Sequence, residues 1–192
     1  MTAAVAGGAG LHADAVDVLR RWRPPDSEQS RLRRLYLDHL RANADGVWRE
    51  CCPDHVTASA LVVSADGSRV LLTLHRRLRR WLQTGGHCEQ ADTTLASAAR
   101  REAVEESGIT DLVVDEAPVL LSRHPVPCGP LRPAHHLDVQ YVAVAPHGAE
   151  PVVSEESDDV RWFLAGSLPA GTDDSVRALV AHALRRLGGA TG

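Results

Sequence analysis

The stretch GGHCEQADTTLASAARREAVEESGI, residues 85–109, places a glycine pair and several carboxylates around one predicted helix. On that helix Glu102, Glu105 and Glu106 fall within one sector of roughly 100°. Like charges three or four residues apart destabilise an isolated helix by about 0.2–0.5 kcal/mol per pair. A divalent cation held by the three carboxylates would offset this repulsion.

Three carboxylates on one side of a helix make an oxygen-rich site that suits Mg²⁺ or Mn²⁺. The pair Gly85–Gly86 allows a backbone carbonyl to approach the same ion closely. Phosphate hydrolysis uses this combination, because metal ions neutralise developing charge and activate water. A solvated charged helix face is the alternative, but it does not explain why Ala98, Ala99 and Val104 are interleaved with the acids.

The composition of the 192-residue chain is that of an ordinary soluble domain, with 44% hydrophobic and 24% charged residues. The formal net charge is −4, so no basic field indicates nucleic acid or an anionic membrane surface as a partner. No apolar run approaches the roughly 20 residues of a membrane span. The first residues lack the basic segment of a secretory signal, so we expect a cytoplasmic protein.

The four cysteines, Cys51, Cys52, Cys88 and Cys128, lie at irregular spacing, and we expect them to be free thiols. Cys51 and Cys52 lie close to His55 in the sequence. No second Cys/His pair follows at zinc spacing, so the sequence does not predict a zinc site there.

Residues 1–55 are expected to form a helical N-terminal extension. A short helix over 11–22 stops at Pro24-Pro25, and a second helix opens at Ser27 and stops at Gly46. Their apolar stripes must be buried either on the rest of the chain or across a homodimer interface.

Residues 56–192 are expected to form the main domain, which is rich in strands. Two β runs within 55–75 surround a turn signal at 65–68. Residues from 85 to the helix start are expected to be a loop. Three further strands are predicted within 111–124, 135–146 and 158–169, and a closing helix within 172–189. Strands with interspersed helices predict an α+β fold with a mixed sheet between helical layers.

The stretch at residues 86–109 resembles the Nudix box, the signature of Nudix hydrolases. Its second half, Arg-Glu-apolar-any-Glu-Glu-any-Gly-apolar, is matched completely from Arg101 to Ile109. Upstream, Trp81, the glycine pair and Glu89 resemble the usual approach to the box. The likeness covers roughly residues 56–187 and implies a Nudix-like α/β/α sandwich.

The resemblance departs from the box at one place. Asp92 stands where the box has its first Glu, and eight residues instead of seven separate it from Arg101. If all were helical, the extra residue would rotate Asp92 by about 100° away from the face of Arg101. We expect the loop or the first helical turn to absorb this one-residue insertion.

The resemblance also implies residue roles. Glu102, Glu105 and Glu106 would hold Mg²⁺ or Mn²⁺, with the carbonyl of Gly85 as a further ligand. The catalytic set would be Glu102, Glu105 and Arg101. Either glutamate, or one from a distant loop, would be the general base, and Arg101 would orient carboxylates. Whether Glu89, Asp92, Glu155 or Glu156 joins the site is left open.

Four residues are candidates for substrate binding. Arg76 lies in the basic run 75–80, which could clamp phosphate or form a solvated hairpin tip. His87 follows the glycine pair, and His135 and His136 stand at a strand entrance after a proline-rich loop. Because neighbouring strand residues point to opposite faces, only one of these last two should face the cleft.

The sequence therefore predicts a metal-dependent hydrolase of the Nudix type. It would cleave a pyrophosphate bond in a nucleoside diphosphate derivative or a nucleoside triphosphate. The alternative is a non-catalytic Nudix module that binds a nucleotide-like ligand as a sensor or regulator. Both hypotheses imply a small nucleotide-like ligand.

Overall fold

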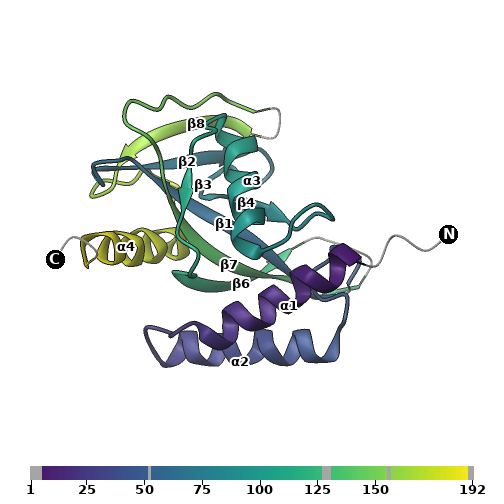
Figure 1. Cartoon of the computed structure of the whole chain (residues 1–192). Coiled ribbons are helices and arrows are strands. Elements are labelled where there is room, and N and C mark those ends of the chain that lie inside the picture. The colour runs from purple at the N-terminus through teal and green to yellow at the C-terminus, as the bar shows by residue number, and fades with distance from the viewer. Residues whose placement is uncertain (1–5, 52, 127–130, 155–156, 190–192) are drawn as a thin grey trace.

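The computed structural model describes residues 6–51, 53–126, 131–154 and 157–189 (Figure 1). Within these ranges the helices are α1 (Ala6–Arg21), α2 (Ser27–Ala42), α3 (Leu95–Ser107) and α4 (Asp174–Gly189). The strands are β1 (His55–Val63), β2 (Arg69–His75), β3 (Arg80–Leu82), β4 (Thr84–His87), β5 (Val113–Val114), β6 (Leu120–Val126), β7 (Ala134–Val144) and β8 (Ser157–Leu164).

The strands form one mixed, curled sheet with the order β3-β2-β1-β7-β5 (Figure 1). β4 also pairs with β1, β6 with β7, and β8 with β2. The central pair β1 and β7 is parallel, and the other pairs are antiparallel. This arrangement confirms the predicted α+β fold with a mixed sheet.

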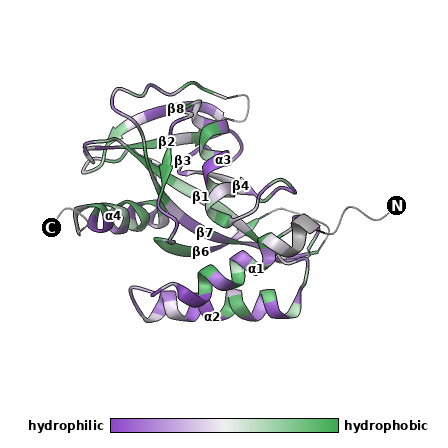
Figure 2. Ribbon diagram, in the orientation of Figure 1, coloured by the Kyte–Doolittle hydropathy of each residue, from purple (hydrophilic) through white to green (hydrophobic). Residues whose placement is uncertain are grey.

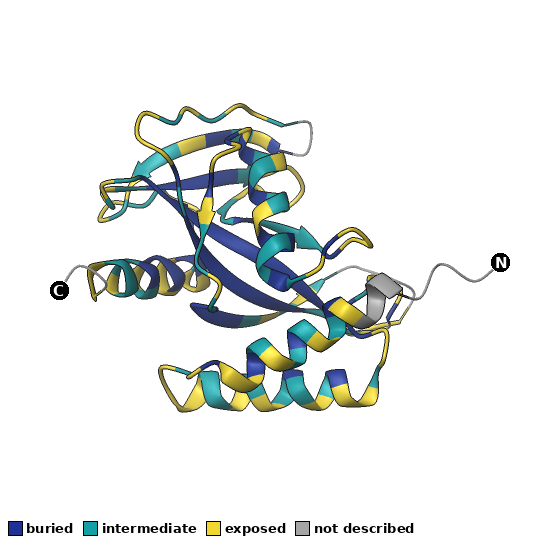
Figure 3. Ribbon diagram, viewed as in Figure 1, coloured by how far each residue is buried: buried dark blue, intermediate teal, exposed yellow. Residues whose placement is uncertain are grey.

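The two faces of β1 pack against different helices, which makes the fold an α/β/α sandwich as predicted. Ala58 and Ala60 share a core with Ala98 of α3. Leu61, which points to the other face, shares a second core with Leu179 of α4. Figure 2 shows the apolar colour concentrated in the central strands, and Figure 3 shows that β1 and β7 are buried along most of their length.

The N-terminal helices bury their apolar stripes against the rest of the chain. Leu19 of α1 and Tyr36 of α2 are fully buried and belong to the same core as α3 and β7. Three polar contacts reinforce this packing. Asp14 accepts a hydrogen bond from the Leu95 backbone N–H at the start of α3. The Gln29 side chain bonds the backbone N–H and carbonyl of Leu121, and the Tyr36 hydroxyl donates to the Asp138 carbonyl. The division of the chain at residue 55 stays a prediction, because this core runs across it.

The predicted start of α2 at Ser27 is confirmed, but its predicted stop at Gly46 was wrong by a few residues. The helix is capped by Asp26, whose side chain accepts from the Gln29 N–H at 2.8 Å. It ends at Ala42, before Gly46, because the Asn43 N–H and side-chain amide both bond the His39 carbonyl. Backbone and side-chain donors of one residue thus satisfy the end of the helix early.

A second correction concerns the expected loop around the glycine pair. Residues 84–87 instead form the strand β4, with Gly85 opposite Ser59 and Gly86 opposite Ala58 of β1. A Cβ atom on Gly85 would lie 2.3 Å from the Ser59 Cβ, so only glycine permits this close pairing.

In the described part of the chain, no helix is both long and apolar enough to cross a membrane.

Candidate active site

The acidic helix α3 begins and ends at local signals. Thr94 caps its first turn by accepting from the Ser97 N–H, and the Ser97 hydroxyl accepts in return from the Thr94 N–H. Gly108 ends the helix in the left-handed region at φ 71°, where glycine has no steric penalty. The helix therefore starts after Asp92, and the extra residue of the box lies in the loop, where we predicted that it would be absorbed.

Asp92 and Arg101 join that loop to the helix. The Arg101 guanidinium donates to both carboxylate oxygens of Asp92, at 3.2 and 3.0 Å, and to the His87 carbonyl at 2.9 Å. Asp92 is buried, and one of its oxygens also accepts from the Glu89 N–H. Because these bonds involve both of its oxygens, Asp92 holds the loop in place against α3.

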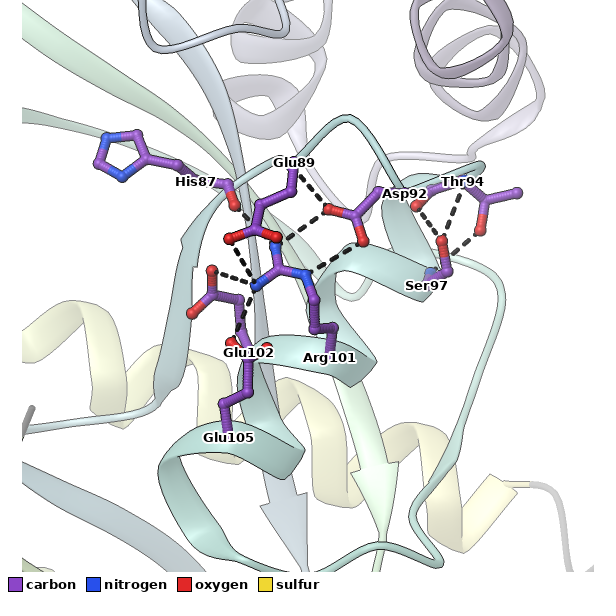
Figure 4. A network of polar contacts seen from close by, with 8 residues as sticks. All are labelled: His87, Glu89, Asp92, Thr94, Ser97, Arg101, Glu102 and Glu105. Atoms are coloured by element: carbon purple, nitrogen blue, oxygen red, sulfur yellow. Dashed lines mark hydrogen bonds and ion pairs between the residues drawn. The ribbon is translucent and has the colours of Figure 1, made fainter. Parts of the chain in front are cut away.

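The same guanidinium faces the acids of α3, as Figure 4 shows. One nitrogen of Arg101 lies 3.0 Å from a carboxylate oxygen of Glu102 and 3.0 Å from one of Glu105. Glu89 approaches the same nitrogen at 3.8 Å. Burial alone would lower the pKa of Arg101, but its bonds to Asp92 and the charge of Glu102 outweigh burial and raise it. One permanent cation therefore draws several carboxylates together.

The two glycines of β4 lie against the acidic side chains of α3. A Cβ atom on Gly86 would lie 2.6–2.7 Å from the Glu102 carboxylate, so this carboxylate occupies space that only glycine leaves open. The Gly85 N–H donates to the Glu106 carboxylate at 3.2 Å. Glu102 and Glu106 are thus both directed at the glycine pair, while Glu105 is about half exposed, with 56% of its side chain accessible.

This set of donors fits Mg²⁺ or Mn²⁺. It consists of carboxylate oxygens beside backbone groups, the ligands that hard divalent cations prefer. Three like charges on adjacent turns, balanced in part by Arg101, also favour a cation electrostatically. The residues that would hold the ion are Glu102, Glu105 and Glu106, with the Gly85 carbonyl beside them.

The predicted substrate-binding residues do not gather at one place. Arg76 pairs with Asp158 of β8, which Arg79 also contacts. His135 bonds the Asp54 carboxylate at 3.0 Å and contacts Arg123. The candidate loop acids Glu155 and Glu156, like Cys52 and Cys128, lie outside the described residues.

His87 and His136, in contrast, come together with His55 in a cluster that sequence reasoning missed. The three ring centroids lie 4.9–5.1 Å apart. Burial and the neighbouring His55 lower the pKa of His87 to about 4. Burial, His87 and His55 lower the pKa of His136 to about 3, so all three rings are neutral near pH 7. No local spacing signals this cluster, because each histidine comes from a different strand.

Asp138, two residues beyond His136 on the same face of β7, is a second polar group that sequence reasoning missed. Its carboxylate accepts hydrogen bonds from the Thr57 and Ser59 hydroxyls at 3.1 and 2.7 Å. Burial raises its pKa, despite these bonds. It stands in an otherwise strand-like run, and its only sequence signal is a charged residue at a position that the sheet buries.

Comparison with known proteins supports the resemblance seen in the sequence. A family model described as "NUDIX domain" matches residues 53–183. No match was found among curated proteins. Many solved structures match, among them the Ap4A hydrolase of C. elegans in a binary complex. It has 17% identity and a TM-score of 0.57, and the match covers 70% of this chain and 98% of that one.

Two further structures are similar at the level of the fold. The dihydroneopterin triphosphate pyrophosphohydrolase of E. coli has 20% identity and a TM-score of 0.58, with 68% of this chain and 95% of that one covered. The Nudix domain of Shewanella oneidensis NrtR, complexed with ADP ribose, has 19% identity and a TM-score of 0.53, with 69% and 87% covered.

The curled mixed sheet and its flanking helices define a domain with the fold of these structures. Because the family model spans well over half of the sequence, the chain belongs to the Nudix family. This confirms the resemblance to the Nudix family that the sequence indicated.

Proposed function

We propose that this protein is a metal-dependent hydrolase that cleaves a pyrophosphate bond in a nucleoside diphosphate derivative or a nucleoside triphosphate. The observation that supports the proposal is the convergence of Glu102, Glu105 and Glu106 of α3 beside the glycine pair of β4. Two of the similar structures are an Ap4A hydrolase and a dihydroneopterin triphosphate pyrophosphohydrolase, and both of these substrates are phosphoanhydrides. A cytoplasmic location remains part of the proposal.

The residues around the site have different roles in the proposed reaction. A bound Mg²⁺ or Mn²⁺ supplies charge neutralisation at the phosphates and a lowered pKa of water. Glu105, the most exposed acid of the set, or Glu102 accepts the proton of the attacking water. Arg101 does not contact substrate. It positions the acids, because its bonds to Asp92 and the His87 carbonyl fix its guanidinium beside Glu102.

The rival hypothesis is a Nudix domain that binds a nucleotide-like ligand without turnover. The Nudix domain of NrtR in complex with ADP ribose shows that the fold can hold such a ligand. The acidic face argues for catalysis here, because a binding module has no need of three acids that repel one another. Binding of ADP ribose with no product formation would favour the rival.

A panel of substrates tests the proposal. Nucleoside triphosphates, dinucleoside polyphosphates and nucleoside diphosphate derivatives, including ADP ribose, are incubated with the full-length protein and Mg²⁺ or Mn²⁺. Products are separated by ion-exchange chromatography and identified by mass spectrometry. We expect phosphate-containing products from at least one compound, and their loss when a chelator is added. No product from any compound with either ion would contradict the enzymatic proposal.

The substitution Gly86→Ala is expected to lower kcat by about 10²-fold. The added Cβ would push the Glu102 carboxylate away from its place, because the two would lie 2.6–2.7 Å apart. Glu102 is a flexible side chain, so the free energy of unfolding should change little. Gly166→Ala is the matched control, since nothing lies within 4 Å of its Cβ position. Equal activity of both variants would show that the position of Glu102 does not matter.

The substrate roles of Arg76, His87, His135 and His136 remain predictions. The alternation of β7 separates the last two, because His136 joins the histidine cluster while His135 pairs with Asp54. If His136 has the substrate role predicted from the sequence, His136→Ala lowers kcat/KM at least several-fold once a substrate is known, and His135→Ala does little. Steady-state kinetics of both variants check this. Equal and negligible effects would place both residues outside the active site.

A further inference from the structure

Three imidazoles from three strands meet at one point on the sheet. His55 of β1 lies opposite His136 of β7 in the parallel register. His87 of β4 lies opposite Thr57, two residues along β1 from His55, so its side chain is on the same face. The centroid distances of 4.9, 4.9 and 5.1 Å form an almost equilateral triangle of rings. His124 of β6 flanks it, with its ring centroid 5.4 Å from that of His136.

The distances between the ring nitrogens are near those of a metal site. One ligand atom from each of the three histidines lies within 4.8 Å of the other two. Two nitrogens bound to one tetrahedral Zn²⁺ at 2.0–2.1 Å are about 3.4 Å apart. The imidazoles would have to rotate so that the nitrogens approach one another by up to about 1.4 Å, the difference between 4.8 and 3.4 Å. A three-histidine set leaves the fourth position open for water or another ligand.

Three buried ring nitrogens, from His55 and His87, have no well-formed hydrogen bond among the described residues. His55 has only 2% of its surface exposed, and within the described residues its contact with the Cys51 backbone falls short of good hydrogen-bond geometry for either ring nitrogen. The Nε2 atom of His87 is also buried without a hydrogen-bond partner within the described residues. Burying such groups without a partner destabilises a fold, so a ligand at the centre of the triangle would stabilise the protein.

The cluster is distinct from the carboxylate site. Gly86 faces Glu102 on α3, and its neighbour His87 points to the opposite face of the sheet. Figure 4 shows the His87 ring directed away from the acids, while its carbonyl accepts from Arg101. The two sites also differ in chemistry, because carboxylate oxygens suit Mg²⁺ and Mn²⁺, whereas imidazole nitrogens suit Zn²⁺ and similar transition metals.

We propose that His55, His87 and His136 bind one transition-metal ion, with Zn²⁺ the first candidate, on the face of the sheet opposite α3. This ion would join β1, β4 and β7, and β4 carries the glycine pair of the carboxylate site. The site does not depend on the hydrolytic function proposed above, because it needs neither the glutamates nor a substrate.

Calorimetric titration of the chelator-treated full-length protein with ZnCl₂, in excess Mg²⁺, tests the proposal. Mg²⁺ occupies the carboxylates, so the titration reports the imidazoles. We expect one Zn²⁺ per chain, and a rise in thermal stability, because the ion binds only the folded state. His136→Gln and His87→Gln should each weaken Zn²⁺ at least about 100-fold. His135→Gln, the neighbour on the other face, and Glu105→Gln, in the other site, should leave it unchanged.

Co²⁺ gives a second measurement that does not rely on any variant. Bound by three imidazoles and a water, Co²⁺ should give the intense visible absorption of a four-coordinate ion, and Zn²⁺ should displace it. Failure of the wild-type protein to bind Zn²⁺ in excess Mg²⁺ would overturn the proposal. So would an unchanged affinity in both cluster variants, or a loss of affinity in Glu105→Gln alone. The last result would assign the ion to the carboxylates and leave the hydrolytic proposal intact.

Discussion

Replacing Glu105 or Glu106 with Gln is expected to lower kcat by about 10²- to 10⁴-fold while the fold remains intact. Each substitution keeps the shape of the side chain and removes one of the charges that would hold the metal ion. Glu105 is more than half exposed, so its loss creates no buried defect. Removing one of several repelling carboxylates should even stabilise the metal-free helix slightly. Steady-state kinetics and thermal melts of the metal-free proteins measure both effects.

The control for this experiment is Glu116→Gln, which removes one carboxylate charge from an exposed position in the segment between β5 and β6. It should retain the activity of the wild-type protein. Full activity of both Glu105→Gln and Glu106→Gln would contradict the assignment of the acidic face of α3 to catalysis. Loss of activity with loss of helical signal would indicate misfolding, and Glu105→Asp would then separate charge from structure.

Deleting residues 1–50 is expected to give an aggregating or unfolded protein. α1 and α2 place Leu11, Leu19, Tyr36 and Leu40 in the central core, each with at most 1% of its surface exposed. Loss of one buried Leu side chain costs about 2–5 kcal/mol, and the whole domain is stable by only about 5–15 kcal/mol. The truncation would also expose an apolar face of the sheet to water. Size-exclusion chromatography and circular dichroism detect both outcomes.

Two point variants make the deletion interpretable. Leu19→Ala should lower the free energy of unfolding by about 2–5 kcal/mol. Tyr36→Phe, which removes only the 3.3 Å hydrogen bond to the Asp138 carbonyl, should cost about 1 kcal/mol. A soluble, monomeric and fully active truncation would instead show that the N-terminal helices are a dispensable appendage, and the core contacts described above would then contribute little.

The elements that the sequence predicts well are those whose signals are local. The hairpin of β1 and β2 follows from its turn, where Asp66 bonds Ser64 and Ser68 and Gly67 has a φ of 72°. The helix α3 follows from the possible caps Asp92, Thr93 and Thr94, of which the structure uses Thr94, and from Gly108 at its end. Residues 3 or 4 apart share a helix face whatever the rest of the chain does, so the acidic face was also visible in advance.

The elements that escaped prediction depend on contacts between distant residues. β4 is a strand only because it pairs with β1, and its glycines permit the close approach of the two backbones. Nothing within residues 84–87 indicates this pairing. His55 was weighed as a metal ligand with its sequence neighbours, yet its spatial neighbours are His87 and His136. Strand order and register decide which distant residues come into contact, and a single sequence reveals neither the order nor the register. The same reason explains why the packing of α1 and α2 was left open.

The contact between Gln29 and Leu121 has a consequence for self-association. Among the described strands, β6 pairs only with β7, so its outer edge offers unpaired backbone groups. Such an edge is a template on which a second chain can add a strand. The Gln29 amide occupies both the N–H and the carbonyl of Leu121, at 2.7 and 3.0 Å, as a neighbouring strand would. α2 therefore blocks the addition of a second chain's strand at this point of the β6 edge.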